Sequence, residues 1–369
     1  MNFILSYLLW SPDPDIFTIP LSFLGLEDRP VRWYGLLFAG GFILSQQVLF
    51  RIFRKEGRPE KDVEKLTVYM VVAVVVGARL GHCLFYNPGY YLSNPIEIIK
   101  VWEGGLASHG GALGMFLGLY MFCKKYPLYK LRWIVDRMVI VVALTGAMIR
   151  IGNFFNSEME GTETHSNMGV VYAAFTESLL QYDERVKSVQ IESDDSRELE
   201  EPGRVPVKAV LTYASIVSPQ EKLFIENNLK SALNRYSDVR EHIDFGEGPL
   251  KYTIVDKGGR SVVEIYGSGI VRHAAQLYEA GYCVVLMLLL YWLWWKKRQT
   301  LPAGFSFGLF MFLLWSLRFV DEFFKMNQEA FEANLALNMG QLLSIPMALF
   351  GVWLMVYVSR KRGWPRMAE

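Results

Sequence analysis

Four arginines in this sequence stand where a guanidinium group could bind a phosphate. Arg79, Arg150, Arg272 and Arg318 each lie near one end of a long apolar segment. An ionisable group inside such a segment costs about 3 kcal/mol on membrane-insertion scales, so it is a functional candidate by default. A guanidinium binds a phosphate through two parallel charge-assisted hydrogen bonds. Any one arginine alone is more simply an interfacial anchor or a structural ion pair, but four at one level predict an anionic phospholipid as the ligand.

Other polar side chains accompany these arginines. Tyr34 opens the first apolar segment and His109 opens the third, while Glu322 follows Arg318 by four residues and so shares its helical face. Each has a simpler alternative role. Tyr34 could belong to the interfacial aromatic belt, His109 could be a hydrogen-bonded helix start, and Glu322 could only neutralise Arg318. The shared level of all these groups favours a site.

Seven apolar segments of about twenty residues carry these groups. A helix of that length crosses a hydrocarbon core about 30 Å thick at 1.5 Å per residue. A soluble protein could contain one or two such helices, whereas seven with Trp and Tyr at their ends indicate a membrane. The sequence therefore predicts an all-α polytopic membrane protein with seven transmembrane helices. The segments are 33–53, 63–85, 106–123, 132–154, 275–295, 304–325 and 340–358.

The loops predict an orientation. Lys and Arg residues cluster after the first, third, fifth and seventh segments, and the alternate loops carry few of them. Since cytoplasmic loops are enriched in cations, we expect the N-terminus outside and the C-terminus inside. Met1–Trp10 has no cationic start and is too short to span, so we expect neither a cleavable signal nor a crossing there. The polar end of each segment then faces the outer leaflet.

Residues 162–271 differ in composition from the rest of the chain. They contain 12 Lys and Arg against 18 Asp and Glu, a net charge of −6 within a chain of total charge +1. This acidic region lies between the fourth and fifth segments and suits a periplasmic head domain. The predicted domains are an outer-surface arm at 1–31, transmembrane helices 1–4 at 32–161, the head at 162–271, and transmembrane helices 5–7 with a cytoplasmic tail at 272–369.

Local patterns predict a small α+β fold for this head domain. Residues 204–217 are rich in β-branched side chains, and residues 252–255 and 261–265 flank a Gly-Gly turn typical of a hairpin. Ser218 begins a capping-box motif with Pro at the first helical position. Residues 183–203 are polar enough to predict a mobile loop.

Composition and motifs exclude several other classes. The near-zero net charge gives no reason to expect nucleic acid as a partner. Cys83, Cys123 and Cys283 lie in or beside apolar segments, and no Cys-x-x-Cys motif or metal-spaced histidine pair occurs, so no metal site is expected. A transporter would show paired broken helices with a midplane site, and a channel a continuous polar stripe. An enzyme open to the outer leaflet fits better, with a lipid transporter or scaffold as the alternative.

Over nearly all of the membrane region, the sequence resembles the prolipoprotein diacylglyceryl transferase family. The motifs that carry this resemblance are Arg32-Trp33-Tyr34-Gly35, Trp102-Glu103-Gly104-Gly105, Ser108-His109-Gly110-Gly111, Arg150-Ile151-Gly152-Asn153-Phe154-Phe155-Asn156 with Glu158 and Gly161, Gln276-Leu277-Tyr278-Glu279, Arg318 to Glu322, and Met339 to Met347. The resemblance implies a multi-pass enzyme of the bacterial inner (cytoplasmic) membrane. Such an enzyme moves a diacylglyceryl group from phosphatidylglycerol to the lipobox cysteine of a preprolipoprotein, with no cofactor. Another phospholipid-headgroup enzyme on the same fold is the remaining alternative.

This chemistry suggests roles for individual residues. A sulfur atom must attack a glycerol carbon while the bond to phosphate breaks, so the site must stabilise departing phosphate and activate a thiol with a pKa of about 8.5. We expect Arg150 and Arg318 to bind the phosphate, with Asn153 orienting it. Deprotonating this thiol needs a base with a pKa near 7, and His109 is the expected base because it is the only histidine of the membrane region beside a Gly pair in such a loop; a water relayed through Glu322 could also take the proton.

The remaining expected site residues bind or shape the lipid headgroup. Tyr34 would donate a hydrogen bond to a lipid oxygen, and Arg79 is a reserve phosphate ligand. The expected catalytic set is His109, Arg150, Arg318, Glu322 and Tyr34, and the expected phosphatidylglycerol-binding set is Arg150, Asn153, Glu158, Gly161, Arg79, Gln276 and Glu279. Residues 273–275 depart from the family pattern, so no role is carried over to them.

Overall fold

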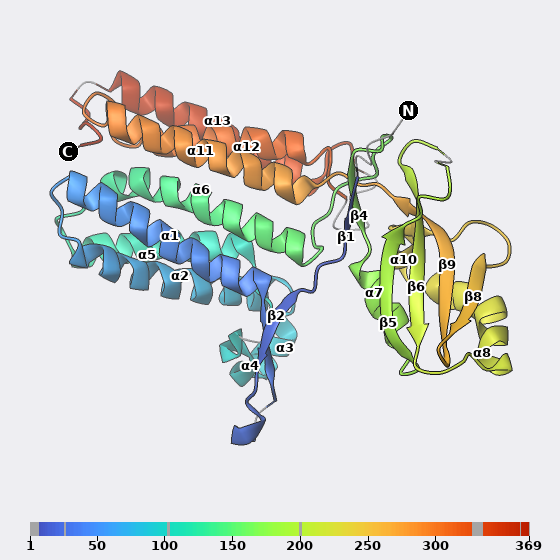
Figure 1. The fold of residues 1–369 in the computed structure, drawn as a ribbon. Helices are drawn as coiled ribbons and strands as arrows, with labels where there is room; N and C mark the ends of the chain where they lie inside the picture. Colours follow the sequence, from blue (N-terminus) through green and yellow to red (C-terminus); the bar gives the residue numbers. More distant parts are fainter. Residues whose placement is uncertain are drawn as a thin grey trace. The chain divides into compact units, whose positions relative to one another are not determined.

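The computed structural model describes residues 7–25, 27–101, 104–198, 201–326, 335–361 and 363–368. The chain forms two compact units (Figure 1). The helical unit comprises Gly35–Arg150, Glu279–Val320 and Asn334–Glu369, and the sheet unit comprises Met1–Tyr34, Ile151–Tyr278 and Asp321–Ala333. Each unit is described by itself below.

Long helices form from the apolar segments. They are α1 (Trp33–Lys55), α2 (Lys61–Phe85), α5 (Ser108–Lys125), α6 (Leu131–Phe155), α11 (Ala275–Lys297), α12 (Phe305–Asp321) and α13 (Met339–Arg360). Within the described residues, five helices are long and apolar enough to cross a membrane, namely α1, α2, α6, α11 and α13. Helices α5 and α12 have 18 and 17 residues and are not among these five. The membrane class agrees with the prediction, whereas the number of seven crossings and their orientation stay predictions.

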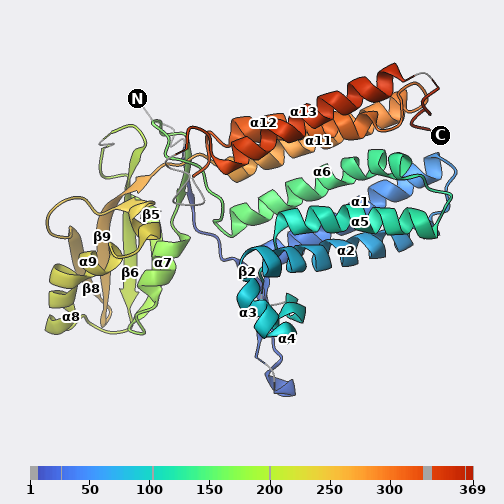
Figure 2. The same cartoon turned by 180° about the vertical axis from the view of Figure 1, so that it is seen from behind.

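Glycines allow α2 and α5 to pack closely, side by side (Figure 2). A Cβ atom built on Gly77 would lie 2.5 Å from the Gly110 carbonyl oxygen, and one on Gly114 would lie 2.2 Å from the Ala73 carbonyl oxygen. Real Cβ atoms do not approach backbone atoms so closely. Small residues at such contacts let helix backbones meet, which is the usual basis of helix association in membranes.

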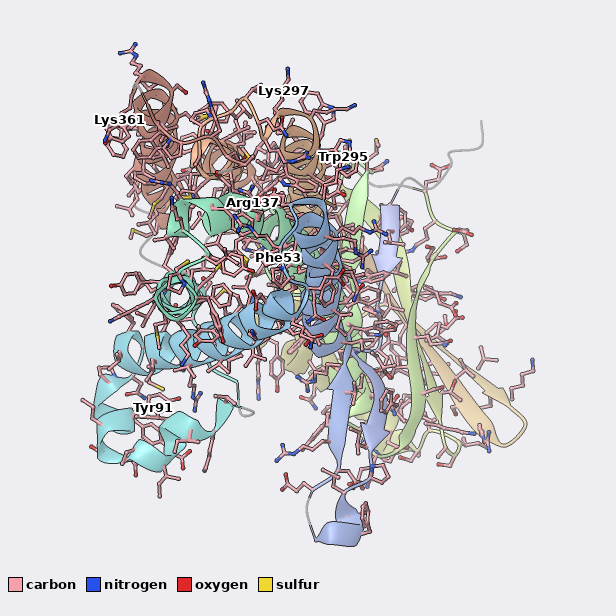
Figure 3. All side chains as sticks on the ribbon, turned by 90° about the vertical axis from the view of Figure 1, so that its left-hand side faces the viewer. Phe53, Tyr91, Arg137, Trp295, Lys297 and Lys361 are labelled. Atoms are coloured by element: carbon pink, nitrogen blue, oxygen red, sulfur yellow. The ribbon has the colours of Figure 1, made fainter. Side chains whose placement is uncertain are left out.

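A buried charged network joins several helices at the end of the helical unit that carries Glu56. The Glu56 carboxylate accepts hydrogen bonds from Arg137 at 2.7 Å and from the indole of Trp133 at 3.0 Å, and also from the indole of Trp294. Arg137, labelled in Figure 3 beside Phe53, is completely buried. Asp136, the neighbouring residue, accepts bonds from backbone N–H groups at the start of α12. The network fixes α1, α6, α11 and α12 to one another at this end.

An antiparallel sheet organises the sheet unit. Its strands are β5 (Val186–Ser193), β6 (Arg204–Tyr213), β7 (Ile243–Asp244), β8 (Tyr252–Lys257) and β9 (Arg260–Ile270), in the order β5-β6-β9-β7 with β8 also paired to β9. Residues of β6 and β9 alternate between the buried and the less buried face. Helices α7 (Ala174–Gln181) and α8 (Pro219–Phe224) lie on one face of this sheet (Figures 1 and 2). The predicted strand is confirmed over residues 204–213 but not over 214–217, and the hairpin is confirmed.

Turn and cap chemistry explain two of these features. Gly258 and Gly259 join β8 to β9 with φ values of 60° and 76°, the positive values that a tight two-residue hairpin turn requires. Ser218 accepts a hydrogen bond from the Glu221 N–H, and the Glu221 side chain accepts one from the Ser218 N–H, which is the predicted capping box. The helical segment continues through Ile225–Leu229 to α9 (Lys230–Leu233), followed by α10 (Ser237–Arg240).

The predicted mobile loop at 183–203 is wrong for residues 186–193. Residues Val186–Ser193 form strand β5, which pairs antiparallel with β6. Val186 and Ile191 are buried in the core of the sheet unit. The many charged residues of this stretch project from the strand, so its polar composition concealed the few apolar side chains that anchor it.

Two smaller strand pairs complete the sheet unit. Strand β1 (Tyr7–Trp10) pairs in parallel with β4 (Gly169–Tyr172), and β2 (Asp15–Ile19) forms an antiparallel pair with β3 (Arg29–Arg32). The Trp10 indole stacks on Phe154 at 4.4 Å and donates to the Phe154 carbonyl. The N-terminal segment is therefore anchored to the C-terminal end of α6.

Candidate active site

Two arginines from different helices converge on one carboxylate in the helical unit. The Glu279 carboxylate of α11 lies 2.9 Å from Arg150 Nε of α6 and 3.5 Å from an Arg318 guanidinium nitrogen of α12. Glu279 is 5% exposed, whereas the two arginine side chains are partly accessible. The Arg318 guanidinium also lies over the ring of Trp315. We call Arg150, Glu279 and Arg318 the arginine cluster.

The arginine cluster places two guanidinium groups beside one carboxylate. Because water is partly excluded, each charge acts more strongly here than it would on an open surface. Arginine forks match the geometry of phosphate oxygens. The structure brings Arg150 and Arg318 together beside Glu279, and their role as phosphate ligands stays a prediction.

A polar turn follows α6 in the sheet unit, at residues 153–161. Glu158 Oε2 accepts a hydrogen bond from Asn153 Nδ2, and Glu158 Oε1 accepts one from Asn156 Nδ2, both at 3.2 Å. The Glu158 carbonyl accepts a bond of 2.7 Å from Gln276 Nε2, and Gln276 Oε1 accepts one from the Tyr172 hydroxyl at 3.0 Å. These five polar residues thus form one continuous network.

Backbone strain marks the same turn. Ser157 and Met159 have φ values of 50° and 58°, although neither is glycine. Residues in this left-handed region cost of order 1 kcal/mol or more and persist where the surroundings hold them. The Asn156 Oδ1 and Ser157 Oγ atoms are buried and make no hydrogen bond within the described residues. The turn therefore presents polar atoms that a ligand or water could satisfy.

Glycine is required at two positions around this turn. A Cβ atom on Gly161 would lie 2.4 Å from the His273 carbonyl oxygen and 2.7 Å from the Phe324 carbonyl oxygen. A Cβ atom on Gly152 would lie 3.0–3.1 Å from atoms of Tyr34, so this glycine lets Tyr34 pack directly on α6. Gly161 thus lies in the polar turn, and Tyr34 packs on α6, the helix that leads into this turn.

Glu322 has a cationic partner that the sequence analysis did not identify. Lys325 Nζ lies 3.1 Å from Asp321 and 3.6 Å from Glu322, and all three side chains are buried. This group follows α12 directly. Lys325 is almost completely buried with two carboxylates. In the sequence it stood out only as a lone cation after the sixth apolar segment.

Arg79 and Arg272 bind backbone oxygens. Arg79 donates to the carbonyls of Ile98, Glu97 and Gly104 at 3.0, 2.5 and 2.6 Å and is 4% exposed. Arg272 donates to the carbonyls of Glu241 and Gly161. These contacts favour structural roles for both arginines, and the role of Arg79 as a reserve phosphate ligand stays a prediction.

His109 lies at the start of α5, where it is exposed. Its ring contacts those of Phe85 at 5.0 Å and Tyr86 at 6.3 Å between centroids. Within the part of the chain that the structure describes, no hydrogen bond or ion pair joins His109 to Arg150 or Arg318. Its role as the base stays a prediction, and the motif residues Trp102 and Glu103 lie outside the described residues.

Two further features complete the inventory of the site. Burial raises the pKa of Tyr172, so its hydroxyl stays protonated and can donate to Gln276. Tyr172 was missed because it lies in the predicted head domain, where its apolar neighbours suggested only core packing.

No group of three or more His, Cys, Asp or Glu side chains suited to a metal ion occurs among the described residues.

An open apolar cavity of about 190 Å³ lies in the helical unit among α1, α2, α5 and α6. Its wall includes Phe38, Met115, Met138 and Ile149. From Ile149 to Met138, α6 advances about 16 Å at 1.5 Å per residue, roughly half of a 30 Å hydrocarbon core. The cavity therefore has about the depth of one lipid leaflet, and Ile149 precedes Arg150 of the arginine cluster.

Comparison with known proteins gives a consistent family match. The model of the prolipoprotein diacylglyceryl transferase family matches residues 22–357. A phosphatidylglycerol–prolipoprotein diacylglyceryl transferase of Tolumonas auensis is 33% identical over 96% of this chain and 99% of its own length. Proteins of the same name from Chloroherpeton thalassium and Porphyromonas gingivalis are 30% and 31% identical, over 97% and 95% of this chain and 96% and 94% of their own lengths.

Proposed function

We propose that this chain, which belongs to the prolipoprotein diacylglyceryl transferase family, transfers a diacylglyceryl group from phosphatidylglycerol to the lipobox cysteine of a preprolipoprotein. This is the first step of bacterial lipoprotein maturation. The relatives carry the name of this transferase, and the arginine cluster is the observation in the structure that best supports the same chemistry here.

The reaction exchanges one bond for another at a glycerol carbon. The cysteine thiolate forms a C–S bond to the diacylglycerol carbon that carries the phosphate. The C–O bond between that carbon and the phosphate oxygen breaks, and the oxygen leaves with the electron pair as glycerol phosphate. The thiol proton passes to a base, and the product is a thioether.

The arginine cluster supports the departure of the phosphate. Negative charge grows on the phosphate as the C–O bond breaks, so fixed donors nearby stabilise the transition state more than the bound substrate. We assign Arg150 and Arg318 to the phosphate oxygens and Glu279 to holding the two guanidinium groups in register. Glu279 therefore acts through the arginines as a positioning residue.

Neighbouring polar residues extend this assignment. Asn153 follows Arg150 by three residues in α6, and Gln276 precedes Glu279 by three residues in α11, so each shares a helical face with a member of the cluster. We propose that Asn153 orients the headgroup and that Tyr34 donates to a lipid oxygen. Glu158, Gly161 and Gln276 then shape the strained turn beside Asn153.

We assign His109 as the base that accepts the thiol proton. An imidazole has an ordinary pKa near 6.5, which suits proton transfer from a thiol at neutral pH. Its exposed position at the start of α5 leaves the ring open to an incoming peptide. Glu322, which contacts Lys325, is the alternative route through a bound water.

The apolar cavity supports a lipid substrate. We propose that one acyl chain of phosphatidylglycerol occupies it, because the cavity is about one leaflet deep and its wall includes Ile149, the residue before Arg150 in α6. The five long apolar helices and the bacterial relatives support a multi-pass location in the bacterial inner membrane. The charge pattern of the loops supports an active site that faces the periplasmic leaflet, with residues 162–271 as a periplasmic head.

The decisive experiment is a transfer assay. Purified protein in vesicles that contain phosphatidylglycerol is mixed with a lipobox peptide, and the diacylglyceryl thioether is measured by mass spectrometry. We expect thioether from the parent protein and a loss of at least tenfold for Arg150→Ala and Arg318→Ala, about 1.4 kcal/mol or more of transition-state stabilisation. Folded protein that forms no thioether would refute the proposal.

A cysteine-free variant tests the origin of the reacting sulfur. Cys83 and Cys283 are buried and Cys123 is half-buried, so none is presented as a nucleophile. We expect the triple variant with alanine at these positions to keep its turnover. A folded but inactive triple variant would show that the substrate does not supply the sulfur alone.

A further inference from the structure

Residues 85–99 form a short helical elbow with an uncovered apolar surface. The elbow includes α3 (Pro88–Ser93) and α4 (Pro95–Ile99), each of which begins at a proline. Its apolar side chains point outward: Phe85, Leu92, Ile96 and Ile99 are each about 70% exposed. Isolated exposed apolar residues are ordinary, but a contiguous group of this kind marks a contact surface.

This surface continues an apolar stripe on α2. Every fourth residue of α2 is an exposed aliphatic side chain, and successive members of this series lie one above the other along a stripe that winds slowly around the helix. The stripe consists of Val68, Val72, Val76, Leu80 and Leu84. Because α2 is one of the five helices able to cross a membrane, this stripe is a lipid-facing surface, and it leads directly into Phe85.

The polar groups of the elbow suit the boundary between lipid headgroups and acyl chains. Tyr86 and Tyr90 are exposed, and tyrosine is enriched at that depth because its ring is apolar and its hydroxyl is polar. The only ionisable side chains in the region 86–100 besides tyrosine are Glu97 and Lys100, which pair at 2.7 Å. The elbow thus presents no unpaired charge to the lipid.

Arg79 holds the elbow against the end of α2. It donates to the carbonyls of Glu97 and Ile98 in the last turn of α4, and the Glu97 carbonyl also accepts a bond of 3.3 Å from the Lys100 N–H. A cation at a helix C-terminus is also favoured by the helix dipole. The ring of Tyr91, labelled in Figure 3, lies 5.2 Å from the Arg79 guanidinium. The buried guanidinium therefore fixes the elbow at one end.

We infer that the elbow at residues 85–99 is an interfacial membrane anchor, which lies in the headgroup and acyl boundary of a lipid bilayer and is held there by Arg79. Its partner is the lipid surface, as continuity with the α2 stripe requires. Short amphipathic helices bind bilayers in this way through their apolar side chains. Because His109 contacts Phe85 and Tyr86, the elbow also fixes the depth of the proposed base, a consequence that rests on the proposed function.

The test measures depth in the bilayer without measuring turnover. Single cysteines replace Leu92 or Ile96 in the full chain, whose native cysteines are changed to alanine, and each is labelled with a nitroxide. The protein is reconstituted in vesicles of phosphatidylglycerol and phosphatidylethanolamine. Power saturation then compares access of oxygen, which enters lipid, with access of a water-soluble nickel chelate. Val72 on the α2 stripe and Tyr182, an exposed aromatic residue of the sheet unit, are matched controls.

We expect the ratio of oxygen access to nickel access at Leu92 and Ile96 to be severalfold above that at Tyr182 and no higher than that at Val72. Nickel access equal to that at Tyr182 would place the elbow in water and overturn the inference. Protection from both reagents would identify a protein partner or a second copy of the chain, and would also overturn it.

The contribution of Arg79 is tested in the same samples. Arg79→Gln removes the charge and most of the donors, so the nitroxide at Ile96 should become more mobile, while the spectrum at Val72, which reports the fold of α2, stays unchanged. Arg79→Lys keeps the charge but loses the fork of donors and should give an intermediate spectrum. An unchanged spectrum at Ile96 in Arg79→Gln would refute the assigned role of Arg79.

Discussion

Replacing Glu279 with glutamine tests the electrostatic design of the arginine cluster. Glutamine has nearly the same shape as glutamate, so the substitution removes one negative charge with little change in packing. The carboxylate lies 2.9 Å from Arg150 and 3.5 Å from Arg318, and after the change the two guanidinium groups face each other without it.

The magnitude follows from these distances. Two unit charges 4 Å apart interact by about 4 kcal/mol at an effective dielectric constant of 20. The arginines are partly exposed, with side-chain exposures of 17% and 25%, so solvent screening reduces this value. We expect a loss of about 1.4–3 kcal/mol in transition-state stabilisation, or roughly tenfold to 150-fold in kcat/KM.

The assay is thioether formation from phosphatidylglycerol and a lipobox peptide over a range of lipid concentrations. Because Glu279 positions the arginines and does not bind the phosphate, kcat should fall while KM for the lipid stays near the parent value. Glu279→Asp keeps the charge and should recover part of the rate. Asp15→Asn, which removes the exposed ion pair with Arg32, is the matched control and should stay within about twofold. A folded Glu279→Gln protein with parental kcat would refute the reasoning.

Three other substitutions test separate parts of the structure. Gly161→Ala places a Cβ atom 2.4 Å from a backbone oxygen and should cost about 1–3 kcal/mol with a clear loss of turnover, whereas Gly89→Ala, with nothing within 4 Å, should be neutral in the same thermal and transfer assays. Tyr172→Phe removes the hydroxyl that donates to the network around the polar turn, and turnover should fall severalfold, in line with about 1 kcal/mol for one hydrogen bond; parental turnover would show that this bond does not support the site. Glu56→Ala leaves Arg137 buried without its carboxylate and should lower stability by about 3–5 kcal/mol, seen as a lower Tm in detergent; an unchanged Tm would show that the pair is not needed.

Strong local signals were interpreted correctly. The hairpin at 252–265 and the capping box at Ser218 depend on a few adjacent residues whose backbone preferences are decisive. The long apolar segments also predicted membrane helices, because their length matches the thickness of the hydrocarbon core of a bilayer. The family motifs around Arg150 and Asn153 were recognisable for a different reason, since they carry chemistry and not structure.

The strand at 186–193 was missed because composition outweighed pattern. Its charged residues indicated a loop, but Val186 and Ile191 are buried in the sheet and the backbone pairs with β6. Pairing of this kind depends on a strand that follows later in the chain, so the sequence of residues 186–193 alone does not predict it.

Partner choice among charged residues was also beyond the sequence. Arg79, Arg150, Arg272 and Arg318 have the same residue type and similar positions at segment ends, so the sequence treated them alike. The structure gives two of them a shared carboxylate, Glu279, and the other two backbone carbonyls.

The sequence by itself determined that this chain has long apolar helices, an acidic region with a hairpin, and arginines at helix ends beside the motifs of one family. Only the tertiary structure decided which arginines meet, which ones hold backbone segments, and which partners Lys325 and Tyr172 take. The physical reason is range: hydrophobic length and turn preference act over a few adjacent residues, whereas an ion pair or a carbonyl contact requires two distant segments to be brought within about 3 Å.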